Sequence, residues 1–141
     1  MTTFTRRILI TLAIILILSC FSIVSMAADK FFIVKHQTIR YVTAYNAGDP
    51  RQTDDTPCIS ADNTNICKRL EQGEKVCAAN FVPLGTKLYV DKVGVCTVTD
   101  RMNKRYRNRV DIAMPKGKYK EAVTFGRQKL MVQILKEMNK H

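Results

Sequence analysis

The sequence is poor in the residues that build metal sites. Its two histidines, His36 and His141, are isolated and lack ligand spacing. Of its five cysteines, no two lie within the two to four residues that zinc sites normally show. We therefore expect no metal and no other cofactor. Internal repeats and low-complexity tracts are also lacking, so the 141 residues fit one domain.

Charge is missing from one long segment at the N-terminus. Arg6 and Arg7 form a short positive region, and the apolar stretch over residues 8–26 follows without a charged residue. The small-residue pattern at 25–27 fits a leader cleavage site. The pattern predicts a signal peptide over residues 1–27.

Two alternatives to a cleaved leader remain open. The apolar stretch approaches the roughly 20 residues of a membrane span, so it could stay as an anchor helix. A lipoprotein box at Cys20 is the weaker alternative, because the apolar run continues past it. All three interpretations export residue 28 onward, to the periplasm, the cell envelope or the medium. Membrane contact is expected only through an uncleaved N-terminal segment.

Acidic residues are scarce, with 12 Asp and Glu against 23 Lys and Arg and a formal net charge of +11. In a cytoplasmic protein this balance would favour nucleic acid as the partner. Export argues against nucleic acid and favours anionic groups of the envelope, such as peptide carboxylates, acidic polymers or lipid headgroups. The charge could equally serve only to keep a small exported domain soluble.

Four cysteines remain once the leader is set aside: Cys58, Cys67, Cys77 and Cys96. An even number in a small exported domain predicts two disulfides, because such a domain buries little core. Four cysteines allow three pairings, and the sequence does not decide among them. We favour Cys58–Cys67 closing a loop and Cys77–Cys96 joining strands. A four-cysteine zinc site is the weaker alternative.

Alternating and β-branched segments, separated by turn residues, predict a mainly β fold. The region 46–65 is rich in Asp, Thr, Pro, Gly and Asn and is expected to be a loop. One short helix is expected over 118–125, with Gly126 as its C-terminal cap. Many short strands with tight turns indicate a small closed or nearly closed barrel. The expected strands cover 38–44, 75–78, 87–90, 93–99, 109–114 and 129–135.

Two aspartates carry the chemistry that the sequence suggests. Asp100 ends one expected strand, and Asp111 lies eleven residues later inside the next. Period-two geometry puts Asp100 on the same face as Cys96 and Val98, which is mostly apolar. Desolvation there, with a second carboxylate nearby, would raise the pKa of one carboxyl group. Such a group stays protonated near neutral pH and can donate a proton to a glycosidic oxygen.

A plainer interpretation of the same aspartates stays open. Five cationic side chains lie between Asp100 and Asp111, and any that approach would lower their pKa values. The aspartates would then cap loop amides or pair with arginines to hold the turn.

Several segments together resemble the three-aspartate ("3D") domain family, whose relatives include membrane-bound lytic transglycosylase A and rare lipoprotein A. The resemblance covers roughly residues 41–135, which sets a barrel domain over 41–136 after an N-terminal segment over 28–40. The matching segments are Val42-Thr43-Ala44-Tyr45, Val82-Pro83-Leu84-Gly85-Thr86, Val98-Thr99-Asp100, Asn108-Arg109-Val110-Asp111, Glu121-Ala122, Phe125-Gly126 and Val132-Gln133-Ile134-Leu135.

The resemblance implies a six-stranded double-psi β-barrel that cleaves peptidoglycan glycan strands by lytic transglycosylation. Asp100 would be the acid and base, and Asp111 would orient it or tune its pKa. A single carboxyl group can serve both steps, because the substrate's own C6 hydroxyl attacks. As substrate-binding residues we expect Tyr45, which could stack on a sugar ring, and Arg101 and Arg109, which could grip peptide carboxylates.

One departure from the family pattern bears on catalysis. The family's first aspartate falls on Ala78 in this chain. Asp54, Asp55 or Asp62 could supply an acid from the loop instead. A non-catalytic wall-binding or wall-loosening module, similar to the expansin-type barrels, is therefore the alternative function.

Overall fold

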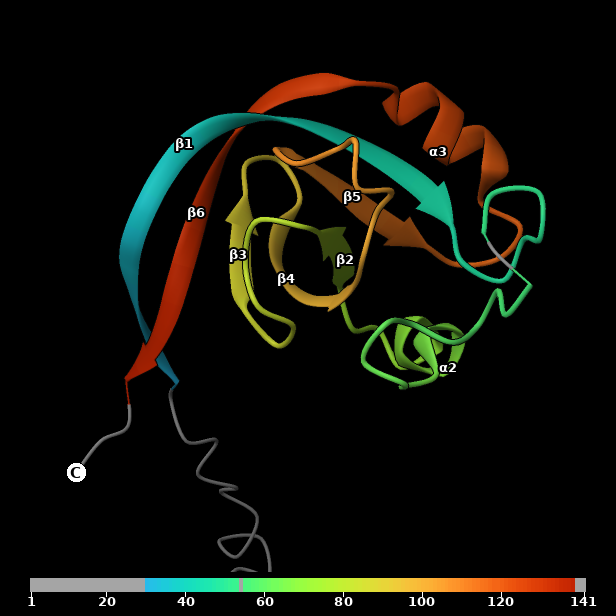
Figure 1. Cartoon of the computed structure of the whole chain (residues 1–141), viewed down its shortest axis with the longest axis horizontal. Helices are drawn as coiled ribbons and strands as arrows, with labels where there is room; N and C mark the ends of the chain where they lie inside the picture. The colour runs from blue at the N-terminus through green and yellow to red at the C-terminus, as the bar shows by residue number, and fades with distance from the viewer. Residues whose placement is uncertain (1–29, 54, 139–141) are drawn as a thin grey trace, which may run out of the picture. The chain divides into compact units, whose positions relative to one another are not determined.

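A closed barrel of six strands forms the fold (Figure 1). The computed structural model describes residues 30–53 and 55–138. The strands follow one another around the barrel in the order β1-β5-β2-β4-β3-β6. The pairs β1/β5 and β2/β4 are parallel, and the other neighbours are antiparallel. The strands are β1 (Phe31–Asn46), β2 (Val76–Ala79), β3 (Lys87–Val90), β4 (Gly94–Asp100), β5 (Arg109–Met114) and β6 (Gln128–Met138). The predicted mainly β, six-stranded barrel is confirmed.

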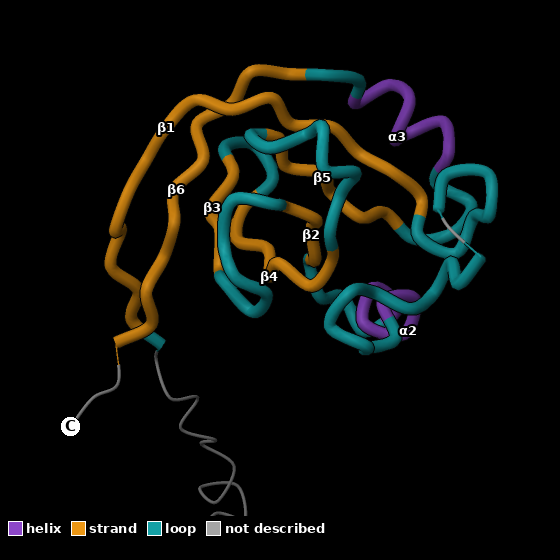
Figure 2. Tube along the Cα trace, viewed as in Figure 1, coloured by secondary structure: helices purple, strands orange, loops and turns teal. Residues whose placement is uncertain are grey.

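Two short helices accompany the barrel, where the sequence predicted one (Figure 2). The predicted helix is α3 (Tyr119–Phe125), and Gly126 ends it at a φ of 62°. The unpredicted helix, α2 (Ile66–Glu71), is too short to show a helical period. Its signal is the N-cap Asn65, whose side chain accepts a hydrogen bond from the backbone N–H of Lys68.

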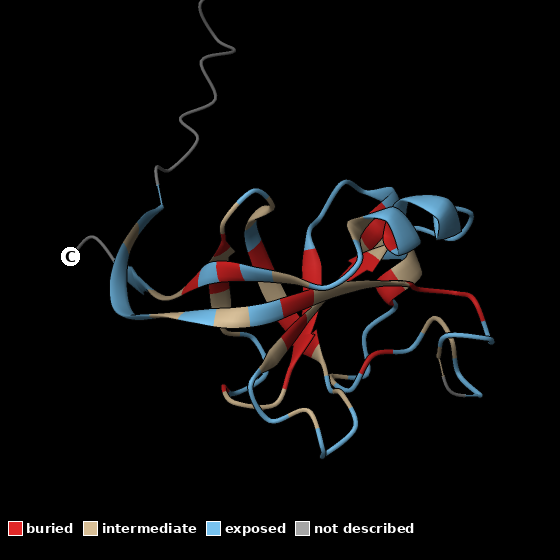
Figure 3. Cartoon of the chain, turned by 90° about the horizontal axis from the view of Figure 1, so that it is seen from above, coloured by how far each residue is buried: buried red, intermediate tan, exposed pale blue. Residues whose placement is uncertain are grey.

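The core fills the barrel with aliphatic side chains from all six strands. Buried segments, red in Figure 3, lie along the barrel strands. A second, smaller cluster lies outside the barrel wall, where Ile66 and Leu70 of α2 pack on Val76 and Ala113. Because α2 covers this patch, the wall of the barrel is buried on both faces there. The residues of the main core include Val42, Cys77, Ala79, Leu88, Val90, Cys96, Val98, Val110, Ile112, Leu130 and Val132.

Strand β1 is longer than predicted. Its 16 residues begin at Phe31, and they pair with β6 from Phe31↔Met138 to Val42↔Gln128. The segment 28–40 is therefore, from Phe31 onward, the first part of the β1–β6 ribbon. The predicted leader lies outside the described residues. Within those residues no helix is long and apolar enough to cross a membrane.

Two disulfides cross-link the fold in the favoured pairing. Cys58 and Cys67 join the loop after β1 to α2, and Cys77 and Cys96 join β2 to β4 inside the core. The zinc interpretation is therefore wrong. Two structural disulfides indicate an oxidising compartment, which supports export.

The two disulfides differ in burial, which predicts the order of their reduction. Cys77 and Cys96 are 0% and 1% exposed, whereas Cys58 and Cys67 are partly exposed. A mild reductant should open Cys58–Cys67 first, which mass spectrometry of alkylated thiols will detect. Each opened bond should lower the free energy of unfolding by about 3 kcal/mol. Earlier labelling of Cys77 and Cys96 would contradict the burial of that pair.

Candidate active site

An irregularity in β4 directs Asp100 out of the barrel. Val98 pairs with Cys77 in the core, but the next residue of β2, Ala78, pairs with Asp100 instead of Thr99. Thr99 is thus an extra residue, as in a β-bulge, and Asp100 turns to the face of Ala78. The expectation that Asp100 shares the apolar face of Val98 is wrong for this reason.

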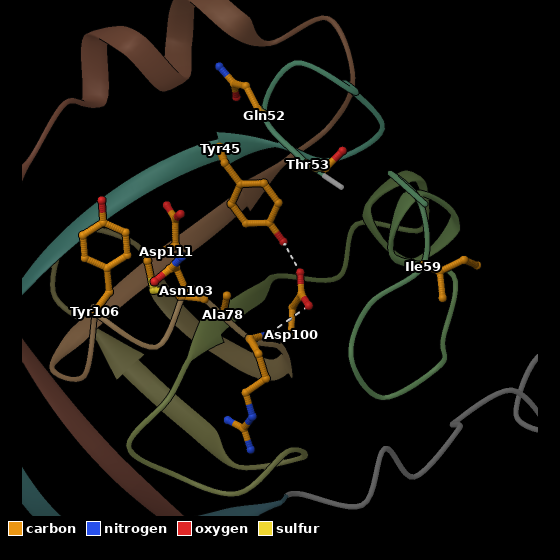
Figure 4. Close-up of a pocket in the computed structure, with 11 residues that line it drawn as sticks. Tyr45, Gln52, Thr53, Ile59, Ala78, Asp100, Asn103, Tyr106 and Asp111 are labelled. Carbon is orange, nitrogen blue, oxygen red and sulfur yellow. Dashed lines mark hydrogen bonds between the residues drawn. The ribbon is translucent and has the colours of Figure 1, made fainter. Parts of the chain in front are cut away.

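The bulge completes a row of four residues across neighbouring strands. Ala78 pairs with Asp100 on β4 and with Asp111 on β5, and Asp111 pairs with Thr43 on β1. The strands of the two aspartates are not adjacent, because β2 runs between them. Two interstrand spacings separate their Cα atoms by roughly 10 Å. Both side chains nevertheless face one pocket (Figure 4).

Two loops wall this pocket, which has a volume of about 270 Å³. The loop between β1 and α2 supplies Gln52, Thr53 and Ile59, and the loop after β4 supplies Arg101, Met102, Asn103 and Tyr106. The first loop is fixed to the bulge, since the backbone N–H of Asp62 donates to the carbonyl of Thr99 at 3.0 Å.

Asn80 fixes the second loop, and the sequence analysis did not identify it. Its Nδ2 donates to the carbonyls of Met102 (3.0 Å) and Asn103 (3.1 Å), and its Oδ1 accepts from the backbone N–H of Met102 at 3.0 Å. One amide side chain thereby satisfies several loop groups. Its position directly after a buried strand was the only signal in the sequence.

Asp111 is the carboxyl group best suited to hold a proton. Burial raises its pKa to about 6, and the charge of Asp100 adds to this shift. Thr43 Oγ1, which donates to Asp111 Oδ1 at 2.9 Å, and the nearby charge of Arg109 oppose it. Desolvation wins, so a fraction of Asp111 is protonated close to neutral pH.

Asp100 has a different environment, with three hydrogen-bond donors around its carboxylate. Its Oδ1 accepts from the backbone N–H groups of Arg101 (2.8 Å) and Ala61 (3.1 Å), and its Oδ2 accepts from Tyr45 Oη at 3.2 Å. Burial and the charge of Asp100 raise the pKa of Tyr45, so this phenol stays protonated and donates. The two carboxyl oxygens of Asp100 have the acceptor capacity for all three bonds.

The two arginines expected near substrate have partners within the protein. The Arg101 guanidinium donates to the carbonyls of Ala79 and Val82, and it stabilises the turn after β2. The Arg109 guanidinium lies 4.1 Å from the ring centroid of Tyr106. In the described part of the chain neither aspartate forms a salt bridge with an arginine. The plainer interpretation is therefore wrong for pairing with arginines, but its other half holds for Asp100, which accepts from two loop amides.

Among the described residues, no acid from the β1–α2 loop lines the pocket beside Ala78. The Asp62 carboxylate accepts from Ser60 and Thr64 within its own turn. Burial alone would raise the pKa of Asp62, but these hydrogen bonds outweigh it and lower the pKa. Asp55 is exposed and does not line the pocket, and Asp54 lies outside the described residues.

No protein-family model and no curated protein matches this chain. The geometry of the pocket must therefore carry the functional argument. Within residues 30–53 and 55–138, no group of three or more His, Cys, Asp or Glu side chains could hold a metal ion. The chemistry that this site offers is acid–base chemistry by two carboxyl groups in unlike surroundings.

The raised pKa of Asp111 makes the stability of the fold depend on pH. Folding favours the protonated form of Asp111, because its pKa is 3.8 in the unfolded chain and about 6 in the folded protein. The stabilisation from this protonated form is fully present below pH 3.8 and is lost as the pH rises through about 6. The loss should be on the order of 3 kcal/mol. Asp111→Asn should remove it, so the variant should be the more stable protein at pH 7. Urea unfolding at pH 4 and pH 7 will test this. Parallel pH profiles for both proteins would contradict the desolvation of Asp111.

Proposed function

We propose that this chain is an exported enzyme that cleaves peptidoglycan glycan strands in the manner of a lytic transglycosylase. One observation carries the proposal: two carboxyl groups face a single open pocket, and burial raises the pKa of one of them, Asp111, to about 6. Pairs of this kind are typical of enzymes that cleave glycosidic bonds by acid–base catalysis.

We assign the acid to Asp111, which reverses the roles expected from the sequence. Protonated Asp111 donates its proton to the glycosidic oxygen, and the bond from that oxygen to the anomeric carbon breaks. The C6 hydroxyl of the same sugar then attacks the anomeric carbon. Its proton returns to the Asp111 carboxylate, and the product is a 1,6-anhydro sugar. A pKa of about 6 suits a group that must first give and then accept a proton.

In this proposal the Asp100 carboxylate stabilises the positive charge that develops on the anomeric carbon. Tyr45 and two backbone amides hold its carboxylate in place before substrate arrives. A preorganised charge of this kind costs no reorganisation during the reaction. Tyr45 therefore positions Asp100, in place of the sugar-stacking role expected from the sequence.

The register supports the 3D-family interpretation and the double-psi topology proposed with it. Ala78, which aligns with the family's first aspartate, lies directly between Asp100 and Asp111. Three aspartates at these positions would form one continuous row. Two parallel strand pairs, β1/β5 and β2/β4, also suit that topology.

A second candidate function rests on that same position. Because Ala78 removes one carboxyl group of the row, the pocket could bind a glycan without cleaving it. The chain would then be a wall-binding or wall-loosening module, and its net charge of +11 would contribute to affinity.

The enzyme proposal predicts a requirement for both aspartates. The full chain, isolated with both disulfides formed, should release anhydro-muropeptides from wall sacculi. Asp111→Asn should reduce release by at least about 100-fold, and Asp100→Asn should also reduce it. The wild-type rate should fall as the pH rises through about 6. Chromatography of the soluble products measures all three effects.

Glu71→Gln, on the exposed surface of α2, is the matched control and should cleave normally. Sacculus binding that survives both aspartate substitutions, with no soluble product from any wall tested, would exclude the enzyme and support the binding module.

A further inference from the structure

The row formed by Thr43, Asp111, Ala78 and Asp100 is called the aspartate row below. A second row of side chains lies beside it on the same face of the barrel. Tyr41 on β1 pairs with Arg109 on β5 and with Lys129 on β6. Tyr41 and Arg109 each precede a member of the aspartate row, Thr43 or Asp111, by two residues. Side chains two residues apart along a strand share a face and are separated by roughly 7 Å.

Cations stack on the aromatic rings of this second row. The Arg127 guanidinium and the Lys129 ammonium lie 4.9 and 5.4 Å from the ring centroid of Tyr41. The guanidinium groups of Arg105 and Arg109 lie 4.7 and 4.1 Å from the ring centroid of Tyr106. Tyr106 also lines the pocket of the two aspartates. We call these six residues the cation–aromatic row: Tyr41, Arg105, Tyr106, Arg109, Arg127 and Lys129.

Among the described residues no member of the cation–aromatic row forms a salt bridge, and the acid that interacts with Arg109 is Asp111 of the neighbouring pocket. The salt bridges among the described residues use Arg51, Arg69 and Lys118, and none involves a member of the row. A hollow of about 330 Å³ lies at the Tyr41 end, and no carboxylate lines it; its walls are Ile39, Arg40, Tyr41, Asn108 and Lys129. Cations held close together repel one another, so an anionic ligand would relieve that repulsion.

We propose that the cation–aromatic row is a subsite for peptide carboxylates attached to the glycan that enters the aspartate pocket. This inference rests on the proposed function, because it assumes that the pocket binds a glycan strand and adds a contact to the peptide carboxylates that the strand carries. Stacked guanidinium groups keep their N–H edges free for bidentate bonds to carboxylates. The ring of Tyr106 borders both rows, so a sugar bound in the pocket can place its substituent over Arg109.

Binding of two matched glycan fragments by the full chain tests the subsite. One fragment carries peptide stems with free carboxylates, and the other has the same sugars without stems. Wild-type protein should bind the stem-bearing fragment more tightly, and added salt should reduce that preference. The double variant R127Q/K129Q should lose roughly three- to tenfold affinity for the stem-bearing fragment alone. Isothermal titration gives both affinities.

The control is the double variant K120Q/K136Q, which removes two exposed cations outside the row and should bind as the wild type does. Equal affinity of wild-type protein for both fragments would overturn the subsite, as would equal losses in the two double variants. A loss in R127Q/K129Q that is as large for a phosphodiester polymer would also overturn it, because the row would then bind anions in general. If sacculi are still cleaved while any of these outcomes is found, the subsite fails and the enzyme proposal does not.

Discussion

The extra residue in β4 is the constraint on which the site depends. Regular alternation would point Asp100 into the core beside Val98, where an ionised carboxylate without a partner costs several kcal/mol. With Thr99 inserted, Asp100 emerges at the end of the strand within reach of two backbone amides and Tyr45. The loop from β1 closes on the same bulge through the Thr99 carbonyl, so the bulge fixes both a floor residue and a wall of the pocket.

The sequence predicts the features that follow from local rules. Alternating β-branched segments predict all six strands, and an even cysteine count in a small exported domain predicts two disulfides. The bulge is not predictable in this way, because it depends on how β4 aligns with β2. These two strands are neighbours in the barrel, but β3 lies between them in the sequence. Helix α2 has six residues, too few for a period, and Asn80 carries no motif. Our proposal that Asp111 is the acid likewise rests on its burial inside β5, which the sequence pattern does not show.

Burial and hydrogen bonding divide the two aspartates into different chemical groups. Asp111 lies in the middle of β5 between two other strands, with one hydroxyl donor, and its desolvation is only partly offset. Asp100 lies at a strand end, where loop amides are free to donate. Position along a strand therefore gives the two carboxyl groups different surroundings: burial raises the pKa of Asp111 inside β5, and loop amides donate to Asp100 at the end of β4.

Ala78 occupies the middle of this row, where the family resemblance would place an aspartate. A third carboxylate between Asp100 and Asp111 would add like charge on both sides and raise the cost of ionising any member of the row. With alanine there, the two remaining groups interact across an intervening strand, and their coupling is only a minor part of the shift at Asp111. The pocket floor gains space for a substrate group at the same position. Burial therefore raises the pKa of Asp111 without a third carboxylate beside it, and the charge of Asp100 across the strand adds a smaller contribution.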